Sequence, residues 1–231
     1  MADIKAIIPF TYKWEGGLSR ATTDTASKNP SPYEYKGVKG WHTNKGITYP
    51  VFKEGSKTLG YEDNAQNFLT MPEDIWLKIA KNKFWDVLKL DTVKSQAVAN
   101  LMFSWIWGSG YAWRNRMVNY LKTKGIDWNK NDFSALAKNL NSLTDKEGEK
   151  KIFDELVEQK KQFLLSLNQP ANEKGWLRRL DDLKNYSYTL IGKTFEATKE
   201  TIKRHPLRTI AVAALLVVGG YFAYVKLIKK K

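Results

Sequence analysis

Apolar residues at the start of the chain recur at helical spacing and predict a first helix that ends near residue 15. Glu15 follows Ile8 by 7 residues and Ile4 by 11, so all three fall on one helical face. The carboxylate of Glu15 is therefore expected to point inward. Partial burial favours the protonated form of a carboxyl group, which is the form that donates a proton. Gly16 and Gly17 then end the helix and leave room for a ligand.

Helical periodicity continues through most of the remaining chain. Capping boxes are predicted at 70–73 and 144–147, each opening a helix with an apolar stripe. The pattern that begins at Thr92 carries almost no charge on any side, which predicts a central buried helix. Residues 33–41 and 46–51 are expected to pair with each other as a small hairpin. The fold class expected is therefore mainly α, a helical domain with a small loop or β excursion, and its predicted core includes Trp76, Trp105 and Trp176.

Composition removes several classes of enzyme. The 231 residues include no cysteine, which excludes a disulfide framework, a thiol nucleophile and a zinc–thiolate site. His42 and His205 are far apart, whereas a catalytic zinc site normally takes two or three histidines. We expect neither a metal nor a cofactor. The formal charge of +14 favours polyanionic partners, but no nucleic-acid-binding motif accompanies it, so no specific nucleic acid is expected.

A second carboxylate, Asp24, stands nine residues after Glu15 in a segment too rich in Thr, Ser, Asn and Pro for regular helix. Glycoside hydrolysis uses such a pair. One group protonates the leaving oxygen, and the other activates water or stabilises the positive centre. The separation of the two groups decides between inversion and retention.

Three further segments follow Glu15 in order. Residues 43–48 read Thr-Asn-Lys-Gly-Ile-Thr, residues 84–88 read Phe-Trp-Asp-Val-Leu and lead to Asn100 and Gly-Ser-Gly at 108–110, and residues 174–180 read Lys-Gly-Trp-Leu-Arg-Arg-Leu. Together they resemble the N-acetylmuramidases of glycoside hydrolase family 108 and their C-terminal peptidoglycan-type domain, over roughly residues 4–185. The resemblance implies a lysozyme-like fold and peptidoglycan as the substrate.

The resemblance also implies roles for particular residues. Glu15 matches the catalytic glutamate of the family, and Asp24 matches the aspartate that follows it. Thr43 matches the threonine that helps to position the water. The family usually runs from the aspartate directly into the threonine signature, whereas residues 25–42 intervene here. Aromatic rings stack on pyranose faces, so the substrate-binding candidates are Trp14, Trp41, Tyr49 and Trp107, together with Asn44 of the signature.

The C-terminal segment has a different character. Residues 209–225 carry no charged side chain, and as a helix they reach about 25 Å, close to the ~30 Å of a hydrocarbon core. A transmembrane anchor is expected at 207–228, preceded by an amphipathic linker helix at 187–206 that could lie on a membrane or dock on the enzyme. The first eight residues, with Asp3 and Lys5, do not predict a signal peptide, which favours delivery by a virus.

The expected organisation is a muramidase catalytic region at 1–90 and a helical peptidoglycan-type region at 91–186 packed on it, followed by the linker and the anchor. The function expected is hydrolysis of the β-1,4 bond between N-acetylmuramic acid and N-acetylglucosamine, by a membrane-anchored, virus-encoded protein acting in wall penetration or lysis. Partners are then peptidoglycan, a lipid membrane through 207–228, and other virion or lysis proteins. Two alternatives stay open: a lytic transglycosylase, and an inactive wall-binding or structural virion membrane protein.

Overall fold

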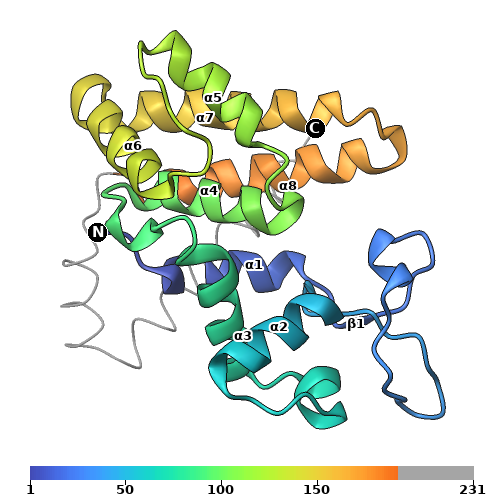
Figure 1. Cartoon of the computed structure of the whole chain (residues 1–231). Coiled ribbons are helices and arrows are strands. Elements are labelled where there is room, and N and C mark those ends of the chain that lie inside the picture. Colours follow the sequence, from blue (N-terminus) through green and yellow to red (C-terminus); the bar gives the residue numbers. More distant parts are fainter. Residues whose placement is uncertain (192–231) are drawn as a thin grey trace, which may run out of the picture. The chain divides into compact units, whose positions relative to one another are not determined.

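Helices dominate the computed structural model, which describes residues 1–191 as one compact unit (Figure 1). The α-helices are α1 (Ile8–Trp14), α2 (Tyr49–Leu59), α3 (Glu73–Ala80), α4 (Gln96–Ser109), α5 (Arg114–Thr123), α6 (Phe133–Glu147), α7 (Glu149–Ser166) and α8 (Pro170–Tyr188). Short helical turns are η1 (Ile4–Ala6), η2 (Thr25–Lys28), η3 (Gln66–Thr70), η4 (Lys81–Trp85) and η5 (Leu90–Thr92). The strands are β1 (Leu18–Ser19), β2 (Thr43–Asn44) and β3 (Ile47–Thr48). The prediction of a mainly helical fold with a small β excursion is confirmed.

The N-terminal helix is interrupted, so the prediction of one continuous helix is wrong. Residues 4–6 form the 3₁₀ turn η1, and α1 starts afresh with Pro9 in its first turn. Proline lacks an N–H donor and is tolerated at a helix start but not in an interior. Glu15 is the C-cap of α1 and has an extended backbone, with φ −92° and ψ 129°. Its orientation therefore depends on neighbouring helices rather than on a helical register with Ile4.

Helix α4 is the buried centre that the uncharged pattern predicts. Its N-cap Ser95 accepts a hydrogen bond from the Val98 amide, and every residue from Gln96 to Ile106 is buried. Helices α7 and α8 pack directly against α4, and α5 and α6 pack on α7 (Figure 1). Because α4 also contacts η1 and η4, it joins the C-terminal helices to the N-terminal part of the unit.

The two predicted capping boxes are wrong, although helices do begin close to both. The hydroxyl of Thr70 donates to the Gln66 carbonyl within η3, and Pro72 is the N-cap of α3. Thr144 lies inside α6, and Gly148 separates α6 from α7. In both cases the threonine is part of the preceding helix. Its hydroxyl donates to a backbone carbonyl of that helix and therefore does not cap the next one.

A three-stranded antiparallel sheet follows α1 in the order β1-β2-β3. Between β2 and β3, Lys45 and Gly46 form a two-residue turn and have φ of 46° and 78°. Positive φ at both positions is the type I′ turn that joins two strands tightly. The indole N–H of Trp76 donates to the Lys45 carbonyl at 2.8 Å and holds the turn against α3. The expected strand at 46–51 is shorter than predicted, since α2 already begins at Tyr49.

Residues 20–42 form an excursion between β1 and β2, drawn at the right of Figure 1. It contains η2 and an isolated bridge between Tyr35 and Val38. The strand that pairs with β3 is β2, at 43–44, and not residues 33–41 as expected. Asp63 anchors the excursion, because its carboxylate accepts from the Tyr33 hydroxyl at 2.7 Å and from the Tyr49 hydroxyl at 3.0 Å. Burial and these bonds to Asp63 raise the pKa of both tyrosines.

The predicted tryptophan core is confirmed for Trp76 and Trp105, which are fully buried, whereas Trp176 is half-buried. Within residues 1–191, no helix is both long and apolar enough to cross a membrane. The expected anchor at 207–228 lies outside the described residues, as does the expected linker from residue 192 onward. The described start of that linker, 187–191, is the end of α8 and the turn after it.

Candidate active site

Glu15 lies where α1 ends, between residues of α4 and α8. Its side chain is 12% exposed. The carboxylate atom Oε1 accepts a hydrogen bond from the indole Nε1 of Trp107 at 2.9 Å and forms an ion pair with the guanidinium of Arg179. Among the bonds of residues 1–191, none is made to the second carboxylate oxygen, Oε2. The expected inward orientation of the carboxylate is thus confirmed.

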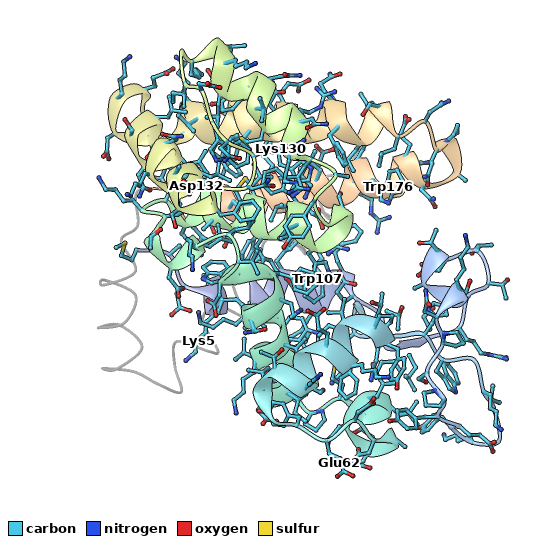
Figure 2. The ribbon with its side chains drawn as sticks, viewed as in Figure 1. Lys5, Glu62, Trp107, Lys130, Asp132 and Trp176 are labelled. Atoms are coloured by element: carbon cyan, nitrogen blue, oxygen red, sulfur yellow. The ribbon has the colours of Figure 1, made fainter. Side chains whose placement is uncertain are left out.

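Two helices that pack on each other bring these partners together. Trp107 is on the last turn of α4, and Arg179 is on α8, 164 positions after Glu15. The Trp107 ring packs against Trp76, Phe84 and Phe103, with centroid distances of 4.7 to 5.5 Å. Figure 2 shows Trp107 at the junction of α4 with the N-terminal part of the unit. The indole N–H therefore has a fixed direction toward the carboxylate.

Gly46 of the β2–β3 turn lies next to the other carboxylate oxygen, Oε2. A Cβ atom at Gly46 would lie 2.4 Å from Oε2 of Glu15 and 2.8 Å from the Trp107 ring. Real Cβ atoms do not approach other atoms this closely, and the φ of 78° also disfavours any side chain. The glycine is thus required for two independent reasons, and it places the turn directly against the acid.

Asp24 lies apart from these contacts. It is exposed, it is the N-cap of η2, and its carboxylate accepts from the Ala26 amide at 2.9 Å. No hydrogen bond or ion pair within residues 1–191 links Asp24 to Glu15. The excursion thus carries Asp24 on a capped turn of its own.

Thr43 is connected to the base of the excursion through His42. The His42 ring is fully buried, with Nδ1 2.9 Å from the Thr43 hydroxyl and Nε2 3.2 Å from the Ala21 carbonyl. His42 therefore ties β2 to the segment that leads to Asp24. The sequence did not single out this role, because a histidine in a loop carries no signal of its burial.

The remaining predicted binding residues have distinct surroundings. Asn44 is 2% exposed, and its amide donates to the carbonyls of Phe68 and Leu69, so it fastens η3 to the sheet. The hydroxyl of Tyr49 is held by Asp63 as described above. Trp41 is half-buried with its indole N–H bonded to the Val38 carbonyl, and Trp14 is half-buried beneath the Arg178 guanidinium, 5.2 Å from its ring. Trp107 is the predicted binding residue that touches Glu15.

Arg179 and a nearby pocket are the features that sequence reasoning missed. The pocket has a volume of about 200 Å³, and it lies between α4, α7 and α8. Its lining includes Arg179 and Trp176 of α8 and Lys160 of α7. The Lys-Gly-Trp-Leu-Arg-Arg motif was the available signal for Arg179. Nothing in that motif indicates that its second arginine reaches Glu15.

Comparison with known proteins supports a family and a fold. Residues 8–110 match the family model described as Glycosyl hydrolase 108. The solved structure of SagA from Brucella abortus is similar, with a TM-score of 0.60 and 17% sequence identity over 82% of this chain and 95% of the SagA chain. Comparison with curated proteins gives no match. The family match includes Glu15, the β2–β3 turn and Trp107, whereas Arg179 lies beyond it.

Proposed function

Residues 8–110 match the glycosyl hydrolase 108 family. From this match we propose that the chain is a glycoside hydrolase that acts on peptidoglycan and that Glu15 is its catalytic acid. The bond cleaved is the β-1,4 linkage between N-acetylmuramic acid and N-acetylglucosamine. The observation that carries the proposal is the setting of Glu15. Its carboxylate is mostly buried against the glycine turn of the family segment, with two donors on one oxygen and none on the other.

The hydrogen-bond donors around Glu15 suit a group that gives up a proton during the reaction. Protonated Glu15 transfers its proton from Oε2 to the glycosidic oxygen while the bond from that oxygen to the anomeric carbon breaks. Negative charge then develops on the carboxylate, where the Trp107 N–H and the Arg179 guanidinium already point at Oε1. Donors aimed at a site of developing charge stabilise the transition state more than the ground state.

Asp24 and Thr43 are proposed to place the attacking water, whose oxygen bonds to the anomeric carbon while its proton passes to the Asp24 carboxylate. The support is the exposure of Asp24 and the connection from Thr43 through His42 to Ala21, which joins the strand to the loop that carries Asp24. Trp14, Trp41 and Tyr49 are proposed sugar contacts through their half-buried rings.

The test is digestion of purified peptidoglycan by the full chain and by Glu15→Gln. The variant keeps the side-chain shape but has no acidic proton, and we expect clearance to fall by at least about 100-fold, the lower range for loss of general acid catalysis. Glu54→Gln is a matched control, since Glu54 is an exposed glutamate of α2. Equal clearance by wild type and Glu15→Gln would refute the acid role.

Product analysis separates the alternatives. Hydrolysis leaves reducing N-acetylmuramic acid ends, whereas a lytic transglycosylase leaves anhydro-muramic ends, which mass spectrometry distinguishes. Binding to walls without release of either product would favour the inactive wall-binding or structural protein.

Membrane anchoring through 207–228 is a further part of the proposal. Its support is the uncharged run at 209–225 between basic residues. Fractionation of the full chain with lipid vesicles, compared with a chain ending at residue 191, tests it. If both chains stay in the soluble fraction and neither associates with vesicles, the anchor is refuted.

A virus-encoded role in wall penetration or lysis is proposed on the same basis. Detection of the protein in purified virions or lysing cells would test that role.

A further inference from the structure

A cationic pocket adjoins the candidate acid, and the proposed chemistry does not use it. The pocket has a volume of about 200 Å³. It is lined by two cations, two hydroxyl groups and an apolar wall: Lys160, Arg179, Ser104, Ser109, Leu164, Leu167, Leu180 and Trp176. Figure 2 shows Trp176 on α8, the helix that also carries Arg179.

Lys160 is the unusual member of this lining. It is 6% exposed, and its ammonium donates to the Ser104 hydroxyl at 2.8 Å. Within residues 1–191, no carboxylate forms an ion pair with it. An ammonium group has three donors, so the bond to Ser104 leaves two without a described partner. Burying a cation without a counter-charge is costly, and such lysines are uncommon.

The surroundings of Lys160 disfavour its charge in the free protein. Burial, with a further contribution from the nearby Arg179 guanidinium, holds the pKa of Lys160 well below its usual value. An anion bound between the two cations would reverse both effects. The pocket therefore has the electrostatic character of a site that is incomplete without a negative group.

Arg179 links the pocket to the reaction. The same guanidinium lines the pocket and pairs with Oε1 of Glu15. A group bound in the pocket is therefore separated from the acid by one side chain. The proposed position of the glycosidic oxygen at Glu15 and the pocket thus share Arg179 as a neighbour.

We propose that this pocket binds a carboxylate borne on a short aliphatic group of the glycan substrate, with Lys160 and Arg179 as its cationic partners. The inference rests on the proposed function and adds to it a determinant of substrate choice. The leucine wall fits the aliphatic part, and the two cations fit the carboxylate. Peptidoglycan offers this chemistry twice, in the lactyl ether of N-acetylmuramic acid and in the terminal D-alanine of its peptide.

The experiment uses the full chain and three forms of one glycan. These are peptide-free glycan with free lactyl carboxylates, the same glycan with the carboxylates converted to methylamides, and glycan that retains its peptides. Wild type is compared with Lys160→Met, which keeps the length of the side chain, and with Lys161→Met, a control at the exposed neighbouring position. The readouts are KM, kcat and the free energy of unfolding.

If the lactyl group is the ligand, methylamidation raises KM of wild type by about 10- to 100-fold, the range for one hydrogen bond to a charged group. If the peptide carboxylate is the ligand, wild type prefers peptide-bearing glycan by a similar factor. In either case Lys160→Met loses the preference, and Lys161→Met retains it.

Equal KM of wild type for all three glycans would overturn the inference while hydrolysis itself stays intact. The wild-type comparison needs no mutation, so it decides even where Lys160→Met fails to fold. Retention of the wild-type preference by a folded Lys160→Met would also overturn it. Absence of hydrolysis of every glycan would instead refute the proposed function, so the two failures are distinguishable.

Discussion

Replacement of Gly46 by alanine tests how closely the acid depends on the β2–β3 turn. Two separate effects are expected from the structure. The φ of 78° is strained for any L-residue, and the new methyl group would lie 2.4 Å from Oε2 of Glu15. The first effect acts on stability, and the second acts on the position of the carboxylate.

The first effect is measured as a loss of unfolding free energy, and the second as a loss of reaction rate. A left-handed backbone costs an L-residue about 1–2 kcal/mol in free energy of unfolding. Ordinary contact begins at 3.4 Å, so the Glu15 carboxylate must retreat by about 1 Å. Misplacement of a catalytic group by that distance lowers the rate by about 100-fold. Retreat is also opposed by Trp107, whose ring would lie 2.8 Å from the same methyl group.

Gly60→Ala is the matched control. Gly60 ends α2 with a φ of 73°, and a methyl group there would meet no atom within 4 Å. Both variants should therefore lose about 1–2 kcal/mol in urea unfolding, but Gly46→Ala alone should lose about 100-fold in kcat on purified peptidoglycan. Equal kcat for the two variants would show that the turn does not position the acid, and the reasoning would be wrong.

Three further predictions follow from other contacts. Trp107→Phe keeps the aromatic packing but removes the N–H bond to Glu15, and kcat should fall about 10- to 100-fold with little change in unfolding free energy; an unchanged kcat would contradict this. Asn44→Ala leaves two carbonyls of η3 without donors, which should cost about 2–4 kcal/mol in urea unfolding, whereas a pure binding role would raise KM without loss of stability. Hydrogen bonds, first from Lys124, lower the pKa of Glu147 from 4.5 to about 2. The stability that this provides is present above pH 4.5 and lost as the pH falls toward 2. Lys124→Met should therefore weaken the acid dependence of unfolding in this range, and an unaltered dependence would count against the network.

The sequence was most informative where the pattern within one segment determines the burial of that segment. Helical spacing and the absence of charge were sufficient to predict α4 as the buried centre, since burial on all sides requires apolar residues on all sides. The family motifs gave Glu15 as the candidate acid, and one of them contains the Lys45-Gly46 turn. Pro9 was visible in the sequence as well, and the rule against proline in a helix interior would have predicted the break before α1.

What the sequence did not reveal depends on contacts between distant segments. The ion pair of Arg179 with Glu15 and the isolation of Lys160 both follow from the packing of α8 and α7 on α4. The burial of Asn44 is of the same kind, because η3 covers it. A polar residue in a motif can either face the substrate or fasten the backbone, and spacing along the chain does not distinguish the two.

The ion pair between Arg179 and Glu15 limits how this chain can be divided and recombined with others. The segment that matches the family model stops at residue 110, and the cation that pairs with its acid is contributed by α8. A chimaera built from the matching segment alone would expose α4 and leave the acid without that counter-ion. Exchange of modules with this chain should therefore keep residues 1–191 together as one piece.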